Sequence, residues 1–127
     1  MNEELLKKLR YKSGQAAAVL NSPPGFSLGN EASDSTDGIC DFVLLFVNNA
    51  RDTEEWLPRV LPILNEDALF WIAYPKQSSK IKTDINRDTL NAIVQNSSEY
   101  RAVSNVSVDE TWSALRFRPQ SKVNTRK

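Results

Sequence analysis

Histidine is absent from the 127-residue sequence, and cysteine occurs once. Without histidine the chain cannot form a Ser-His-Asp triad or a Cys-His nucleophile pair. Histidine-ligated zinc or non-haem iron is excluded for the same reason, and a lone Cys40 can build neither a thiolate metal site nor an internal disulfide. Proton transfer near neutral pH would therefore need a carboxylate, lysine or tyrosine with a shifted pKa.

Net charge and long apolar runs are also missing. Lysine and arginine total 16, as do aspartate and glutamate, so no global field gathers nucleic acid or anionic lipid. The longest apolar run, Phe42–Val47, is far shorter than the roughly 20 residues that span a bilayer. The first residues, Met1–Glu4, lack the basic-then-apolar order of a secretory signal. We therefore predict a cytoplasmic protein without a membrane partner.

The length and hydrophobic share fit one ordinary domain, which we place at residues 1–118. Residues 119–127 are polar and basic and are predicted to be a disordered tail. The basic residues near this end have one interleaved aromatic, Phe117. This pattern favours a solvated terminus over a nucleic-acid site.

Three compact apolar runs predict buried strands: Ala16–Leu20, Asp41–Val47 and Ala68–Tyr74. Branched and aromatic side chains fill the last two, as expected for strands covered on both faces. Residues 101–108 and 112–118 show partial alternation and are joined by three residues. So short a link indicates antiparallel neighbours.

Helices are predicted at 3–11, after residue 51 and at 87–95. In the second helix, Asp52 and Glu55 have the spacing of a capping box, and an apolar stripe runs from Trp56 to Leu64. Its two prolines, Pro58 and Pro62, predict a kink or two short pieces. Either Asn86 or Asp84 would cap the third helix. Residues 27–38 read as a loop with at most a turn of helix.

Buried strands that alternate with helices indicate an α/β fold with right-handed crossovers. We predict a three-layer, Rossmann-like, mostly parallel sheet of about five strands that ends in an antiparallel pair. In such sheets ligands bind outside the carboxyl ends of the parallel strands. We call this edge of the sheet, at the carboxyl ends of the parallel strands, the rim. The segment after residue 108 lies at the rim only if 101–108 runs parallel to the other strands. The candidate ligand-binding residues are Asn21, Pro23, Pro24, Gly25, Phe26, Asn48, Tyr74, Lys76, Thr83, Asp84, Arg87, Asp109, Glu110 and Trp112.

Each candidate also has a purely structural explanation. Asn21 and Asn48 can satisfy turn backbones, and Pro23–Gly25 can simply reverse the chain. Asp84 can cap a helix, and Trp112 can be a core or rim aromatic. The other charged candidates can be hairpin or solvated surface residues: Lys76, Arg87, Asp109 and Glu110.

Several blocks of the sequence resemble a family of small uncharacterised bacterial proteins, a domain of unknown function. These blocks are Leu20–Phe26, Asp41–Val47, Trp71–Lys76, Thr83–Asp84 and Asp109–Ser113. The resemblance extends from about residue 8 to 118. It implies a truncated relative of the class I methyltransferase fold, which binds S-adenosylmethionine. It further implies that 41–47 and 68–74 match that fold's fourth and fifth strands.

The sequence departs from methyltransferases after the first strand. A Gly-x-Gly type loop is expected there, but Asn21-Ser22-Pro23-Pro24 stands in its place. The acidic residue that would hold the cofactor's ribose has no clear counterpart. These departures argue against S-adenosylmethionine as a cofactor, so the resemblance implies a fold without an activity.

The leading hypothesis is a non-catalytic or regulatory module that binds a small molecule or a protein at the strand ends. The alternative is a small enzyme or degenerate transferase that uses Lys76, Asp84 or Glu110. A carboxylate beside Lys76 in a closed pocket would favour that alternative. A third reading is a homodimer formed through a sheet edge or aromatic rim.

Overall fold

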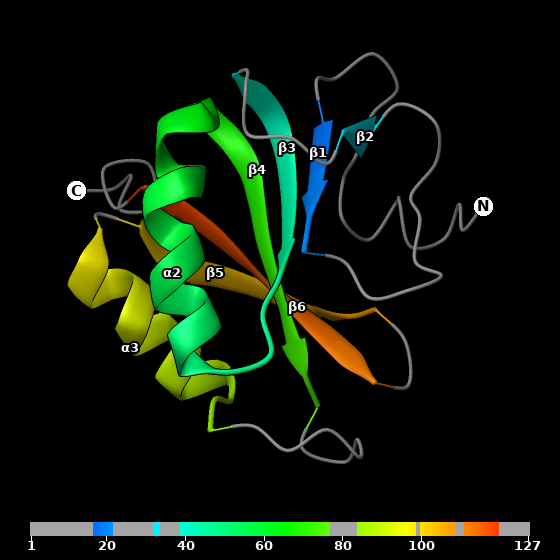
Figure 1. Ribbon diagram of the computed structural model, residues 1–127, viewed down its shortest axis with the longest axis vertical. Coiled ribbons are helices and arrows are strands. Elements are labelled where there is room, and N and C mark those ends of the chain that lie inside the picture. Colours follow the sequence, from blue (N-terminus) through cyan, green and yellow to red (C-terminus); the bar gives the residue numbers. More distant parts are fainter. Residues whose placement is uncertain are drawn as a thin grey trace.

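A six-stranded sheet forms the centre of the protein (Figure 1). The computed structural model describes residues 17–21, 32–33, 39–76, 84–98, 100–108 and 111–119. The strand order across the sheet is β2-β1-β3-β4-β6-β5. The strands are β1 (Ala17–Leu20), β2 (Ala32–Ser33), β3 (Cys40–Phe46), β4 (Leu64–Pro75), β5 (Tyr100–Ser107) and β6 (Trp112–Pro119).

The sheet is mixed, so the predicted mostly parallel sheet fits only in part. β2, β1, β3 and β4 are joined by three parallel pairings, whereas β6 pairs antiparallel with both β4 and β5. The chain thus places its last strand between β4 and β5. Because β5 and β4 are both antiparallel to β6, they run in the same direction. Residues 101–108 thus run parallel to β4, which was the condition for the segment after residue 108 to lie at the carboxyl ends of the parallel strands. β5 ends at the same edge of the sheet as β4.

Five of the strands match the prediction of about five, and a short sixth strand, β2, lies within the predicted loop 27–38. β2 has two residues and pairs with β1 through Ala17 opposite Ala32. Two residues are too few to produce a periodic pattern, so only the pairing with β1 defines this strand.

The three predicted buried strands are confirmed as β1, β3 and β4. The side chains of β3 alternate between two buried clusters on opposite faces of the sheet, with Val43 and Leu45 in one cluster and Phe42 and Leu44 in the other. Both faces are apolar, which explains the continuous apolar run. β4 begins earlier than predicted, since Leu64 pairs with Cys40 across an irregularity in the register.

Both described helices, α2 (Ala50–Val60) and α3 (Arg87–Ser97), cover the same face of the sheet (Figure 1). Leu57 of α2 and Leu90 of α3 are completely buried against it. We call this the helix face. The helix predicted at 3–11 lies outside the described residues, and the described helices form one layer. At 11 residues each, neither described helix is long enough to cross a membrane.

The N-cap of α2 lies three residues before the predicted cap, Asp52. It is Asn49, whose side chain accepts a hydrogen bond from the backbone N–H of Asp52 at 2.9 Å. Asp52 therefore lies inside the first turn, where its charge favours the helix dipole. Of the two predicted outcomes, a kink or two short pieces, the structure has the second, because α2 ends at Val60 and a short 3-10 helix, η1 (Leu61–Ile63), follows. Pro62 falls in this second piece, whereas Pro58 lies inside α2.

Of the two predicted caps of α3, Asn86 and Asp84, the structure has Asn86. The side chain of Asn86 accepts from the backbone of Asp88 and Thr89, and the hydroxyl of Thr89 accepts in turn from the backbone N–H of Asn86. This reciprocal capping fixes the first turn of α3 at the carboxyl edge of the sheet.

A β-bulge in β5 changes which side chains face the helices. The register with β6 shifts between Ala102 and Ser104. Before the shift, Ala102 packs with the helix-face cluster, whereas after it Val106 packs on the opposite face. An inserted residue reverses the alternation of a strand in this way. Asn105 is therefore turned toward the helix face.

The single cysteine, Cys40, is buried in the helix-face cluster. Burial raises the pKa of its thiol, and the neighbouring carboxylate of Asp41 acts in the same direction. Because the reactive species is the thiolate, Cys40 is a packing residue at neutral pH.

Candidate functional site

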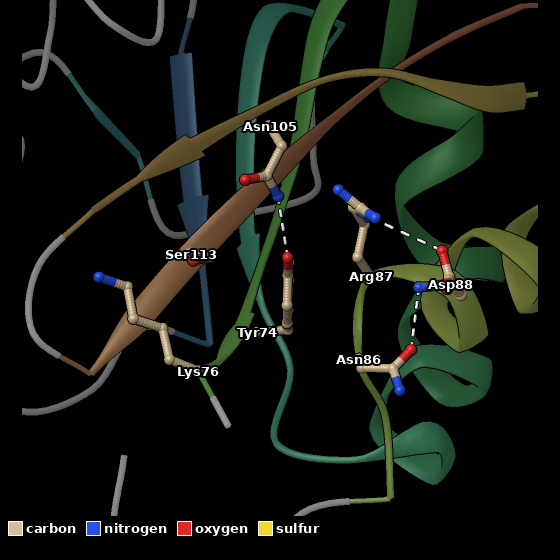
Figure 2. Close-up of a pocket in the computed structure, with 7 residues that line it drawn as sticks. All are labelled: Tyr74, Lys76, Asn86, Arg87, Asp88, Asn105 and Ser113. Atoms are coloured by element: carbon tan, nitrogen blue, oxygen red, sulfur yellow. Dashed lines mark hydrogen bonds and ion pairs between the residues drawn. The ribbon is translucent and has the colours of Figure 1, made fainter. Parts of the chain in front are cut away.

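An open cleft of about 470 Å³ lies at the carboxyl end of β4 (Figure 2). It is bounded by the last residues of β4, the first turn of α3 and the adjoining parts of β5 and β6. Open α/β sheets present their ligand sites at this edge. The lining residues are Tyr74, Lys76, Asn86, Arg87, Asp88, Asn105 and Ser113.

A hydrogen bond between Tyr74 and Asn105 forms the centre of the cleft. The Tyr74 side chain is largely buried, and its hydroxyl accepts from the Asn105 side-chain amide at 2.8 Å. Ser113 lies directly opposite Tyr74 across the β4–β6 pairing. This bond depends on the bulge, since without it Asn105 would face the other side of the sheet.

Lys76 is fixed at the end of β4 by two hydrogen bonds. Its backbone N–H donates to the carbonyl of Thr111 at 2.7 Å, which extends the β4–β6 pairing by one step. Its ammonium donates to the hydroxyl of Ser107 at 2.7 Å. The positive charge is thereby held beside the ends of β4 and β5.

Arg87 supplies a second positive charge, on the other side of Tyr74 in Figure 2. Its guanidinium lies 3.7 Å from a carboxylate oxygen of Asp88, and both side chains are mostly exposed. An exposed pair of this kind is worth at most about 1 kcal/mol. The guanidinium can therefore turn toward a bound anion at small cost.

The other described candidates do not join this cleft, and two of them organise the start of α2. Asp84 accepts a hydrogen bond from the backbone N–H of Ala50 at 2.8 Å. Asn48 donates from its backbone and its side chain to the carboxylate of Asp52. Asp84 thus links the segment before α3 to the first residue of α2.

Asn21 bridges the carboxyl ends of β1 and β3. Its side-chain amide donates to the carbonyl of Phe46 at 2.9 Å, and its backbone is left-handed, with φ of 56°. The strand order reverses between β1 and β3, and a Rossmann-type cofactor is held at such a crevice. Here a side chain ties the two strand ends together. Residues 22–31, where the cofactor loop of such a fold would lie, are outside the described residues.

Asn21 should tolerate glycine better than alanine. Both changes remove the hydrogen bond to Phe46. Alanine in a left-handed backbone conformation costs about 1–2 kcal/mol. Glycine adopts this conformation without strain and destabilises the protein only by raising the conformational entropy of the unfolded chain. We expect Asn21→Ala to be less stable than Asn21→Gly by about 0.5–1 kcal/mol. Urea unfolding followed by tryptophan fluorescence measures the difference. Equal stability, or the usual order with glycine worse, would contradict the assigned geometry.

Trp112 lies on the face of the sheet opposite the helices. Its side chain is buried and meets Phe46 edge-to-face, with ring centroids 5.1 Å apart. This places it in the core, the structural explanation that the sequence left open. The remaining candidates lie outside the described residues: Pro23, Pro24, Gly25, Phe26, Thr83, Asp109 and Glu110.

The sequence reasoning brought Tyr74, Lys76 and Arg87 to one place but missed four lining residues. Asn86 had been assigned only as a helix cap. The other three are Asp88, Asn105 and Ser113. Ser113 could not be placed, because the sequence pairs 112–118 only with 101–108 and the structure alone sets β6 beside β4. Asn105 could not be placed either, since its orientation depends on a bulge that the sequence pattern does not reveal.

Within the described residues, no group of three or more Cys, Asp or Glu side chains is placed to hold a metal ion. The polar atoms of the cleft come from amides, hydroxyls, two cations and the carboxylate of Asp88. This set is rich in hydrogen-bond donors, which anions and polar organic groups require.

No family model matches the sequence, and no curated protein matches it significantly. Among solved structures, the chain is similar to the mitomycin 7-O-methyltransferase MmcR, with a TM-score of 0.56 and 12% identity. The match covers 92% of this chain and 53% of that one, so the chain spans about half the length of MmcR. At this identity the likeness shows a methyltransferase-like α/β fold. The resemblance to a bacterial domain of unknown function stays a prediction.

Proposed function

We propose that this protein is a non-catalytic module that binds a small anionic molecule in the cleft at the end of β4. The observation that carries the proposal is the position of Lys76 and Arg87 on either side of the bonded pair Tyr74–Asn105. Two cations and one carboxylate give the lining an excess of positive charge. The cytoplasmic location predicted from the sequence stays part of this proposal.

The cleft residues are held in place before any ligand arrives. Tyr74 is bonded to Asn105, and Lys76 is bonded through both its backbone and its ammonium. Preorganised donors lower the cost of ordering a site when a ligand binds. The first turn of α3 also points its positive dipole end toward the cleft. The amides of Asp88 and Thr89 in this turn already donate to Asn86, so the direct contacts to the anion that we propose come from the side chains.

A small enzyme or degenerate transferase receives less support from the same contacts. The ammonium of Lys76 donates to a serine hydroxyl, and the carboxylate of Asp84 binds the backbone of α2. Glu110 lies outside the described residues. The groups named for catalysis thus have structural partners where they are described.

Titration with inorganic pyrophosphate, followed by two-dimensional amide NMR, tests the proposal. We expect shifts confined to residues around 74–76, 86–88, 105 and 113. Arg87→Ala and Lys76→Ala should each weaken binding about ten- to a hundredfold, because a hydrogen bond to a charged group is worth about 1.5–3 kcal/mol.

Arg51→Ala is the matched control. Arg51 also lies in the first turn of a helix and pairs with a nearby acid, Glu55, at 3.5 Å, but it is on α2 and is not among the residues that line the cleft. Its removal should leave binding unchanged. Shifts spread over the whole chain, or an equal loss in Arg51→Ala, would show only nonspecific attraction.

A further inference from the structure

A second hollow, of about 290 Å³, lies along β5. It shares Arg87 and Asn105 with the cleft at the end of β4. Its other lining residues are Ala102, Val103, Ser104 and Leu115. Two hollows that share lining residues are adjacent.

The two hollows differ in chemistry. The cleft at the end of β4 is lined by amides, hydroxyls and charges, whereas Ala102, Val103 and Leu115 give the second hollow an apolar wall. Val103 lies at the bulge and is 38% exposed. Among the described residues, it is one of two large hydrophobic residues that are exposed. An apolar side chain at the rim of a groove can contact a ligand without rearrangement.

We infer that the two hollows form one groove for an elongated ligand that has an anionic head and an apolar tail. This inference rests on the proposed anion site and specifies its ligand class. The head lies between Lys76 and Arg87, and the tail runs along 102–104 toward Leu115. Residues 102–105 of a strand extend about 10 Å, which sets the length of tail that gains contact. Arg87 and Asn105 stand where head and tail meet.

A series of alkyl phosphates tests the inference by calorimetry, from inorganic phosphate through butyl to octyl phosphate, below micelle-forming concentrations. We expect the Kd to fall about two- to fourfold for each methylene that enters the groove, since burying a methylene is worth up to about 0.8 kcal/mol. A parallel series of carboxylates shows whether phosphate or carboxylate is the preferred head. In both series the gain should stop once the tail exceeds the groove.

Val103→Thr removes apolar character while it keeps the branched shape and strand preference of valine. The variant should lose most of the dependence on chain length and retain binding of inorganic phosphate. Ile39→Thr is the matched control, because Ile39 is the other exposed large hydrophobic, at 59%, and lies outside the groove. It should behave like the unmodified protein.

Three results would overturn the inference: an equal Kd for inorganic and octyl phosphate, a chain-length dependence that survives in Val103→Thr, or the same loss in Ile39→Thr. If inorganic phosphate binds while the tail adds nothing, the anion site stands and the groove fails. If no member of either series binds, the anion site fails as well. Amide spectra of each variant establish that it is folded.

Discussion

Replacing Phe70 with alanine is expected to lower the free energy of unfolding by about 3–5 kcal/mol, the range for truncating a buried aromatic. Phe70 is completely buried on the helix face of β4. Its ring meets Tyr100 of β5 edge-to-face at 5.7 Å and lies 5.9 Å from Phe117 of β6. One side chain therefore packs three strands together, and its loss leaves a cavity among them.

Chemical unfolding monitored by tryptophan fluorescence measures this effect, because Trp71 is the next residue and is buried on the other face. Leu69→Ala provides the comparison on the same strand, since Leu69 is only partly buried. Leu69→Ala should lower the free energy of unfolding by clearly less than Phe70→Ala. A loss for Phe70→Ala below about 1.5 kcal/mol, the range of tolerated core changes, would contradict the assigned packing.

The second large effect is expected at Trp112. Trp112→Ala should also destabilise the protein by about 3–5 kcal/mol, because it removes a buried ring and its edge-to-face contact with Phe46. Trp112→Phe keeps an aromatic ring beside Phe46 and should restore a large part of the loss. Unfolding curves of the two variants, recorded under the same conditions, measure the difference.

A binding measurement distinguishes the two roles considered for Trp112, a core residue or a ligand-binding residue. Trp112 lies on the face opposite the helices, whereas the cleft opens on the helix face. Folded Trp112→Phe should therefore bind pyrophosphate as the unmodified protein does. A loss of affinity as large as that of Arg87→Ala would return Trp112 to the binding site.

Much of the sheet could be predicted because its central strands are apolar on both faces. β3 and β4 each contain an uninterrupted apolar run, Phe42–Phe46 and Ala68–Tyr74, that no solvent-exposed segment would carry. The cap Asn86 could be predicted as well, since the side chain that closes a helix lies next to it in the chain. Buried strands and helix caps of this kind are set by residues close together in the sequence, so they can be predicted without knowledge of the fold.

The two errors at helix starts have different causes. Asp52 has the spacing of a cap but serves inside the first turn, because Asn49, three residues earlier, already closes α2. This choice is local, and the sequence offered both polar residues. Asp84 stands near α3 in the sequence yet bonds to Ala50 of α2. Here only the arrangement of the two helices selects the partner.

By itself, the sequence determined that the chain uses no histidine chemistry, that its central strands are buried, and that a glycine-rich loop does not follow the first of them. These properties depend on residue type and short-range pattern. The tertiary structure decided what takes the place of the loop: Asn21 joins the ends of β1 and β3. It also decided where the polar groups converge, because the position of β6 and the bulge in β5 turn Asn105 toward Tyr74. Pairing between strands far apart in the chain creates that cleft, and no local pattern encodes it.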